Sequence, residues 1–212
     1  MIFNHNFLPK FNLQRIDSLS GRSYITPEGN QYQSVTTLLS KNTSEYINEW
    51  RDAVGLKEAD RVTKRATDRG TALHDALEKF ILNETPHISN FLAKSIFKPF
   101  SKVLLDNVDN IRALEYPLYS DVMKLAGTID LCADWKSEPS IIDFKSSNKL
   151  KSEYEIHDYF IQASIYSYMI EERYHLNIPK IVILIGVEYS NHIQVFEEHR
   201  THFKNDIVKL LK

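Results

Sequence analysis

Residues 127–145 read Gly-Thr-Ile-Asp-Leu-Cys-Ala-Asp-Trp-Lys-Ser-Glu-Pro-Ser-Ile-Ile-Asp-Phe-Lys, and the rest of the chain can be understood around them. Two apolar-rich runs, 125–135 and 140–144, flank the turn-like segment 136–139, which predicts a β-hairpin. Asp143 and Lys145 are two residues apart on the second strand, so their side chains share one face while Phe144 points to the other. With Asp130 on the first strand, the hairpin gathers two carboxylates and one ammonium.

Carboxylates at this density suit Mg²⁺ or Mn²⁺, which bind oxygen ligands together with water and substrate phosphates. A metal ion there would polarise a phosphoryl oxygen, while Lys145 could orient the attacking water or offset the charge on the phosphate. This chemistry is phosphodiester hydrolysis. The alternative is a strand pair with exposed acids and a salt-bridging lysine, because D-x-K triplets are common by chance.

The composition limits the class of protein. A chain of 212 residues with 42% hydrophobic and 25% charged residues predicts one soluble globular domain. No apolar run approaches a membrane span and the first residues do not form a signal peptide, so we expect no membrane contact and an intracellular location. The single cysteine, Cys132, excludes a four-cysteine iron–sulfur cluster within one chain. The net charge of −2 limits any DNA contact to a local patch.

Turn signals and apolar periodicity predict the order of the elements. We expect an N-terminal arm and hairpin (1–30), a helical region (36–107), a sheet core with the candidate site (112–198) and a C-terminal helix (199–212). Residues 1–20 show no clear periodicity and are predicted to be partly irregular. Within the rest of the chain, helices are predicted at 44–54, 56–83, 88–107 and 154–175, and a buried strand at 180–187.

Several residues could contact DNA, most of them in the helical region. The hydroxyls of Ser34 and Thr36 stand where a helix could begin, so they either cap that helix or grip a phosphate. Basic residues follow at helical spacing, but acids are interleaved with them, so this face is either a DNA track or a solvated, salt-bridged surface. The remaining candidates are hydroxyl groups, which could contact a phosphate, and one aromatic ring, which could stack on bases. The candidates are Arg61, Lys64, Arg65, Arg69, Thr71, Ser146, Ser147 and Trp50.

Four further residues could complete the site, and each has a second interpretation. His74 and Glu78 lie one helical turn apart, either as a boundary pair or as a metal ligand whose ring the carboxylate orients. Glu115, in the predicted strand 112–119, either faces solvent or adds an acid to the cluster. Tyr166, one turn after Gln162, is either a core aromatic or a partner of the site.

Together these residues resemble the RecB-type branch of the PD-(D/E)xK nuclease superfamily. Its pattern is a helical His, an acid in a G-x-x-D context, a D-x-K triplet and Q-x-x-x-Y on the following helix. The pieces occur in this order as His74, Gly127-x-x-Asp130, Asp143-x-Lys145 and Gln162-x-x-x-Tyr166. Within the branch, the stretches 34–39, 70–78, 112–115 and 143–147 are most similar to the mitochondrial genome maintenance exonucleases and their phage and bacterial relatives.

The resemblance implies an α/β fold, with a central mixed sheet flanked by helices, and a Mg²⁺- or Mn²⁺-dependent exonuclease. Asp130, Asp143 and the carbonyl of Phe144 would hold the metal, with His74 in or beside its ligand shell. Lys145 would position the attacking water. Gln162 and Tyr166 would order Lys145 or the scissile phosphate, and Glu78 and Glu115 would support the ligands from outside.

The implied partner is single-stranded DNA or a DNA end, during replication, recombination or repair. The chain has no helicase motif and no basic, Ser-rich presequence, so we expect a stand-alone monomer in the cytoplasm of a bacterium or of a phage-infected cell. Two other functions fit the same residues. One is a double-strand end-resecting exonuclease or structure-specific endonuclease, and the other is a catalytically silent nucleic-acid-binding protein.

Overall fold

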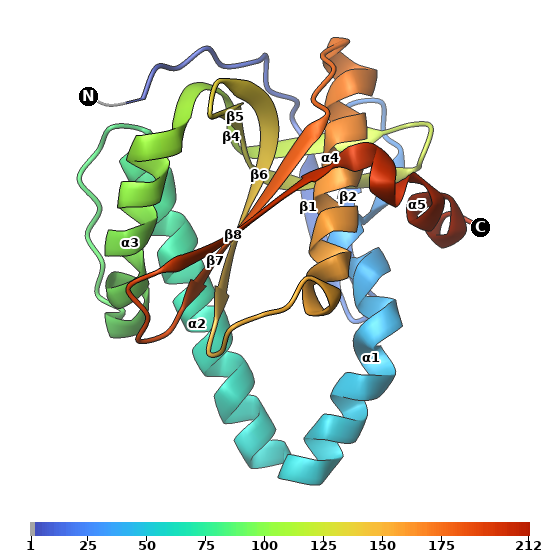
Figure 1. Ribbon diagram of the computed structural model, residues 1–212. Coiled ribbons are helices and arrows are strands. Elements are labelled where there is room, and N and C mark those ends of the chain that lie inside the picture. The colour runs from blue at the N-terminus through green and yellow to red at the C-terminus, as the bar shows by residue number, and fades with distance from the viewer. Residues whose placement is uncertain (1–2) are drawn as a thin grey trace.

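The computed structural model describes residues 3–212, and the side chains of all of these except residues 42–46. The first two residues of the predicted arm therefore lie outside the described residues. The predicted fold class is confirmed, because helices flank both faces of one mixed sheet of eight strands (Figure 1). Among the helices of the described residues, none combines the length and apolar character that a bilayer span requires.

The predicted hairpin is confirmed as strands β5 (Leu125–Trp135) and β6 (Glu138–Ser147). Only two residues turn the chain, Lys136 and Ser137, with φ of 51° and 67°. Such paired positive φ values match the twist of a hairpin, which explains a turn shorter than the predicted 136–139. Strand β4 (Val108–Ser120) pairs antiparallel with the opposite side of β5.

The sheet continues beyond β6 through the strand that was predicted to be buried. β7 (Lys180–Val187) pairs in parallel with β6, and β8 (Ile193–His199) pairs antiparallel with β7. Seven of the eight residues of β7 are buried, as its continuous apolar sequence predicts.

The N-terminal strands correct one prediction. β1 (Gln14–Ser18) lies within the segment predicted to be partly irregular, and it pairs with β2 (Gly21–Ile25), which pairs with β3 (Gln31–Ser34). Four of the five residues of β1 are exposed, so the strand lacks the apolar alternation by which a sequence indicates a strand. β3 then joins β5 in parallel through only two residue pairs.

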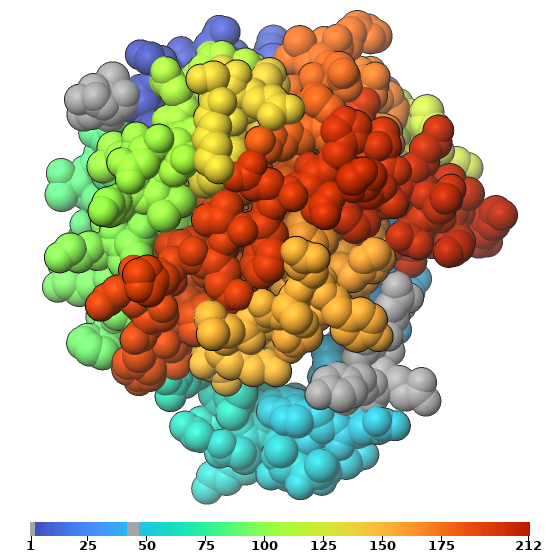
Figure 2. All heavy atoms as spheres, viewed as in Figure 1, coloured from blue at the N-terminus to red at the C-terminus, as the bar shows by residue number. Residues whose placement is uncertain are grey.

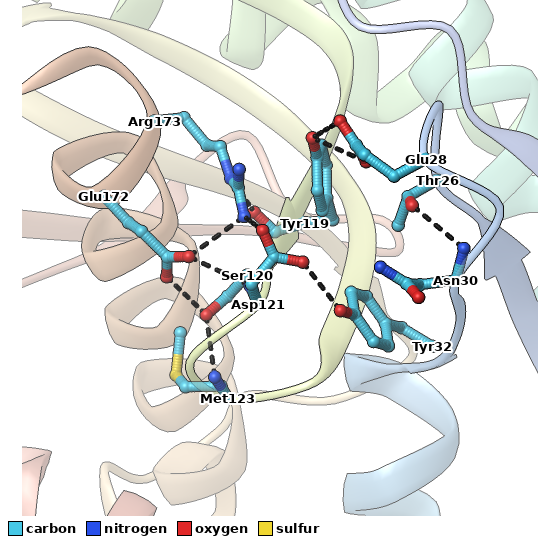
Figure 3. A network of polar contacts seen from close by, with 10 residues as sticks. All are labelled: Thr26, Glu28, Asn30, Tyr32, Tyr119, Ser120, Asp121, Met123, Glu172 and Arg173. Carbon is cyan, nitrogen blue, oxygen red and sulfur yellow. Dashed lines mark hydrogen bonds and ion pairs between the residues drawn. The ribbon is translucent and has the colours of Figure 1, made fainter.

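A polar network holds this N-terminal part against the core (Figure 3). The Tyr119 hydroxyl donates to Glu28, and the Tyr32 hydroxyl donates to Asp121 at 2.6 Å. Arg173 stacks 3.8 Å from the centre of the Tyr119 ring and pairs with Asp121. The turn between β2 and β3 is therefore linked to β4, to the turn that follows β4 and to helix α4 (His157–Tyr174).

Helix α1 (Val35–Val54) begins directly after β3, because Ser34 caps it by accepting a hydrogen bond from the Thr37 N–H. It is therefore longer than the predicted helix 44–54. Gly55, with φ of 84°, connects it to helix α2 (Leu56–Ile81), which passes Gly70 without a break. Figure 1 shows α1 and the first half of α2 projecting from the sheet as a V, and residues 60–68 are almost all exposed.

Two apolar cores cover the two faces of the sheet. α2 and α3 (Phe91–Asn107) pack on the face that carries Phe144. α4 and the C-terminal helix α5 (Lys204–Leu210) pack on the opposite face, with short 3₁₀ turns at Tyr154–Ile156 and Arg200–Phe203 leading into them. Asp143 and Lys145 belong to the α4 face, so their predicted separation from Phe144 is confirmed.

Candidate functional site

The site lies where β5 and β6 separate. Their pairing ends at Leu131 and Ile142, whereas β5 pairs with β3 only at Leu125 and Ala126. Within this gap the Phe144 N–H donates to the Asp130 carboxylate, with N and Oδ2 2.7 Å apart. A side chain thus takes over a hydrogen bond of the strand ladder, and it fixes Asp130 at the fork.

On one side of the fork, Asp130 meets an imidazole and a second acid. His74 Nδ1 lies 3.2 Å from Glu115 Oε1 and 3.6 Å from Asp130 Oδ1. One ligand atom from each of these three residues lies within 4.8 Å of the others, so the group could hold a metal ion. We call His74, Glu115 and Asp130 the acid side of the site.

Glu115 reaches this position from an unusual backbone conformation. Its φ is 42°, in the left-handed region that costs a residue with a side chain of this size free energy. Its neighbours Leu114 and Tyr116 keep their pairing with Leu131 and Ile129 of β5. Such strain at a candidate site is typical of residues whose placement matters for function. Of the two interpretations of Glu115, the geometry favours an acid of the cluster.

His74 also contacts the carbonyl that we predicted to be a metal ligand. Its Nε2 lies 3.0 Å from the oxygen of Phe144. Burial lowers the pKa of His74, but the charge of Asp130 and the hydrogen bond to Glu115 outweigh burial and raise this pKa to about 9. In the metal-free protein at neutral pH, His74 is therefore a cation held between two acids.

Glu78 lies one turn beyond His74 on α2 and was expected to orient its ring. Among the described residues, no hydrogen bond joins the two side chains, and Glu115 makes that contact instead. Burial and the nearby charges of Glu115 and Asp75 raise the pKa of Glu78.

On the other side of the fork, Asp143 is buried and forms an ion pair with Lys145. The Gln162 amide donates to Asp143 Oδ1 at 3.3 Å. Burial raises the pKa of Asp143 to about 6 despite the neighbouring ammonium. Burial acts to lower the pKa of Lys145, but Asp143 and Asp130 raise it by more, so Lys145 stays protonated.

Tyr159 completes this group, which we call the lysine side: Asp143, Lys145, Tyr159 and Gln162. The Lys145 Nζ lies 5.0 Å from the centre of the Tyr159 ring, within the range of a cation–π contact. Sequence reasoning did not include Tyr159 among the candidate site residues. Its spacing three residues before Gln162 on one helix is the signal that could have placed it near the site.

Tyr166 is buried beneath the fork, next to the glycine of the G-x-x-D pattern. A Cβ on Gly127 would lie only 2.6 Å from the Tyr166 hydroxyl oxygen. The glycine of the G-x-x-D pattern is therefore required for a steric reason, because only glycine lets the Tyr166 ring approach β5 so closely. Tyr166 is a buried aromatic that contacts the site in two ways, through the backbone of β5 and through a side-chain hydrogen bond with Gln162.

The four basic residues of α2 that were candidates for DNA contact all have intramolecular partners. Arg61 pairs with Glu58 at 2.6 Å and Lys64 with Asp68 at 2.8 Å, both on the exposed face of the helix. Arg65 and Arg69 instead converge on one buried acid, Glu188, which directly follows β7. Arg61 and Lys64 fit the interpretation as a salt-bridged face, whereas Arg65 and Arg69 lie beside the candidate site.

Arg65 and Arg69 line a cleft of ≈ 440 Å³ that also borders Ser146, Ser147 and Tyr159. A second cleft, of ≈ 370 Å³, runs between α1 and α4 and is bordered by Thr36, Leu39, Ile47, Tyr159 and Gln162. Tyr159, which covers the Lys145 ammonium, is common to both clefts. Both clefts therefore border the lysine side.

The remaining candidates for DNA contact are dispersed. Ser34 is buried as the cap of α1, while Thr36 and Thr71 are exposed. Ser146 accepts a hydrogen bond from Arg69, and the buried Ser147 bonds to the backbone of Lys149. Trp50 is half-buried on α1.

Sequence reasoning also missed Glu188. Its position directly after the apolar run 180–187 is a signal, since polar residues at the carboxyl end of a parallel strand often belong to a site. Its partners Arg65 and Arg69 lie more than a hundred residues away in the chain, so the sequence could not indicate the pairing.

The chain is similar to a curated human protein and to a solved structure. No family model matches the chain. The human protein Mitochondrial genome maintenance exonuclease 1 is 24% identical over 162 residues, which are 69% of this chain and 47% of that protein. The chain thus matches about half the length of this curated relative. Among solved structures, a candidate exonuclease from Eubacterium rectale covers 84% of this chain and 64% of its own, with 11% identity and a TM-score of 0.44.

Proposed function

We propose that the protein is a metal-dependent nuclease that hydrolyses phosphodiester bonds in single-stranded DNA, starting from an end. The observation that carries the proposal is the meeting of Asp130, Asp143 and Lys145 at one fork of the sheet, with His74 and Gln162 joining from two helices. The similarity to an exonuclease over 69% of the chain supports it. We also propose that Lys145 and Asp130 have the roles expected from the sequence.

The residues of the acid side fit a divalent metal ion. Two carboxylates and an imidazole present ligand atoms within 4.8 Å of one another, and Mg²⁺ and Mn²⁺ both accept such ligands. The fork contains three carboxylates (Glu115, Asp130 and Asp143) but only one ammonium and one imidazole, so it can bind a further cation. Asp130 belongs both to this group and to the ligand set that the sequence predicts. When bound, the ion would polarise a phosphoryl oxygen and lower the pKa of its water.

Lys145 acts in this scheme as a cation and hydrogen-bond donor. Because the charges of Asp143 and Asp130 raise its pKa, it keeps its proton at neutral pH in the metal-free protein. Its ion pair with Asp143 and the Tyr159 ring hold the ammonium in one place. From there it can orient the attacking water or stabilise the charge that develops on the phosphate.

Gln162 and Tyr166 are positioning residues in this proposal. Gln162 donates to the carboxylate that holds Lys145, and Tyr166 packs under the backbone of β5 close to Asp130. Neither contact requires the side chain to touch the substrate. Their role is to keep the lysine side rigid, which a reaction based on positioned charges requires.

The two clefts that meet at Tyr159 offer a path for a nucleic-acid strand past the lysine side. The cleft next to α2 carries cations, whereas the cleft next to α1 has a larger apolar share from Leu39 and Ile47. Backbone phosphates suit the first environment and bases suit the second.

The test compares linear with covalently closed circular single-stranded DNA of one sequence, with Mg²⁺, for the wild type and Lys145→Ala. We expect the wild type to degrade only the linear strand. Lys145→Ala should reduce turnover by about 10³-fold, which is typical when a group that stabilises transition-state charge is lost. The fold should persist, since Asp143 can take up a proton when its partner is removed, and thermal unfolding checks this.

The other outcomes separate the alternatives. Cutting of the circle by the wild type alone would make the protein an endonuclease with the same site. A linear duplex degraded faster than the single strand would indicate an end-resecting enzyme. Binding without any cleavage would leave the catalytically silent binding protein, and full turnover by Lys145→Ala would refute the assigned role of Lys145.

A further inference from the structure

The cleft between α2, the end of β6 and the end of β7 has features that the proposed hydrolysis does not require. Four cations and one acid line it, namely Arg61, Arg65, Arg69, Lys151 and Glu188. Ser146, which also lines it, directly follows Lys145. Figure 2 shows on this face that the segment after β6 lies next to the projecting half of α2. The cleft therefore opens to solvent beside the lysine side.

Arg69 is fixed in the wall of the cleft. It is 4% exposed, its Nε donates to the Ser146 hydroxyl at 2.9 Å, and its Nη2 donates to the Ser146 carbonyl at 3.2 Å. Its Nη1 pairs with Glu188. All three nitrogens of the guanidinium thus have protein partners, so Arg69 is a structural element of the cleft.

Arg65 differs from Arg69 in exposure and in its contacts. Its side chain is 44% exposed, and only its Nη2 is engaged, by Glu188 at 2.5 Å and the Tyr189 hydroxyl at 3.5 Å. Among the described residues, its Nε and Nη1 have no hydrogen-bond partner. Glu188 orients Arg65 without neutralising the cleft, because one carboxylate faces two guanidiniums and leaves a net positive charge.

Other donors surround the same space. The Ser146 hydroxyl accepts from Arg69, which leaves its own hydrogen for another acceptor. The side chain of Lys151 pairs only distantly with Glu155, at 3.4 Å. A guanidinium with two unused nitrogens, a hydroxyl hydrogen and an ammonium are the groups that bind a phosphate's oxygens.

We propose that this cleft is a binding site for a phosphate group of the substrate strand, in which Arg65 contacts the phosphate while Arg69 and Glu188 hold Arg65 in position. The inference rests on the proposed function, since it concerns a second phosphate of the strand whose scissile bond lies at Lys145. The phosphate is either a terminal monoester or an internal diester, and the chemistry of recognition is the same for both.

The test uses Arg65→Ala with Lys57→Ala as the matched control, because Lys57 is an exposed cation on the same helix that lies outside this cleft. Internally labelled oligonucleotides of one sequence carry a phosphate or a hydroxyl at each end. Affinity is measured by anisotropy in EDTA, and kcat and KM are measured with Mg²⁺. We expect Arg65→Ala to weaken binding and raise KM by about 10- to 100-fold, as for loss of a charge-assisted hydrogen bond, with kcat changed by less than about twofold.

Arg65→Lys, which keeps a charge beside Glu188, should recover part of the affinity, and thermal unfolding checks both variants. If Arg65→Ala loses affinity only for oligonucleotides that carry a phosphate at one particular end, the cleft binds a terminal monoester. That end then gives the polarity of degradation. An equal loss for all oligonucleotides identifies an internal diester.

Equal affinities of Arg65→Ala and Lys57→Ala would overturn the phosphate site even if the wild type cleaves DNA, and so would a wild type that binds no oligonucleotide. Arg65-dependent binding without cleavage would instead preserve the phosphate site and remove the nuclease.

Discussion

The acid side and the lysine side lie on opposite sides of the fork between β5 and β6, and their carboxylates are neutralised in different ways. On the lysine side, Asp143 is 3% exposed and already has its cation, Lys145, together with an amide donor. On the acid side, Glu115 and His74 are about a third exposed and Asp130 is 11% exposed. The two carboxylates there share one imidazole, whose charge depends on pH.

This difference separates contacts that the protein makes within itself from contacts that a bound metal ion would make. On the lysine side, the acid already has a cation and an amide donor in contact with it. The acid side reaches a comparable balance only by protonating His74, and a divalent ion would replace that proton. Changes at the lysine side should therefore alter stability and turnover, whereas changes at the acid side should alter metal affinity and its dependence on pH.

The largest effect on stability is expected from Gly127→Ala, which disturbs the packing of Tyr166 against β5 beneath the lysine side. The new Cβ would lie 2.6 Å from the Tyr166 hydroxyl oxygen and 2.8 Å from its Cε1, so the buried ring or β5 must move. Overpacking of this kind should lower the free energy of unfolding by about 1–3 kcal/mol, measured by urea denaturation.

Gly70→Ala is the control, because a Cβ there would meet only Ser146 Oγ, at 3.9 Å, and alanine favours the helix. The Gly127→Ala and Tyr166→Phe changes should be non-additive, since the phenylalanine lacks the nearest clashing atom. Simple additivity would argue against the contact.

Substitutions of Glu115 and Glu78 test which of these two glutamates belongs to the acid side. Glu115→Gln removes the carboxylate that lies 3.2 Å from His74, and we expect it to weaken Mn²⁺ binding by about tenfold or more in calorimetric titration. Glu78→Gln, one turn from His74 without a hydrogen bond to it, should change the affinity by less than about threefold, because its charge is partly screened. Equal losses in the two variants would return Glu115 to a supporting position.

The pH dependence of metal binding follows from His74. Its pKa of about 9 means that a metal ion must displace a proton at pH 7, so affinity falls as pH falls below that value. We expect Mn²⁺ affinity to rise by up to about tenfold between pH 7 and 8, with about one proton released per ion. His74→Gln should abolish most of this slope. The pKa of Asp143, about 6, is too low to supply the proton in this range, so an unchanged slope in the variant would contradict the assignment.

Much of the fold follows from local patterns in the sequence. The two apolar runs and their turn predict β5 and β6, and strand periodicity places Asp143 with Lys145 and opposite Phe144. These predictions succeed because they depend on neighbouring residues along one or two strands. The candidate residues His74, Asp130 and Gln162 are also brought together, because helix and strand order restrict where each can lie.

The parts that the sequence did not predict depend on long-range packing or on strain. Glu115 adopts a left-handed backbone that its residue type disfavours, so no propensity indicates it. Glu188 meets Arg69 across 119 residues of chain, and β1 is too exposed to show an apolar pattern. The geometry of the substrate is not encoded in these residues, since the same group of side chains can serve strands, ends or loops of nucleic acid.

The narrow attachment of β3 to β5 also bears on local opening of the molecule. Only two residue pairs join these strands, and the further contacts at this rim come from the polar network around Tyr119 and Arg173 and from a small apolar cluster of Tyr24, Tyr119 and Ala126. Strands β1 to β3 can therefore form a cooperative unit that opens without unfolding the β5–β6–β7 core, and its amide protons would exchange with solvent sooner. Because α1 begins at Val35, directly after the last residue of β3, each such opening would also displace the wall of the cleft between α1 and α4.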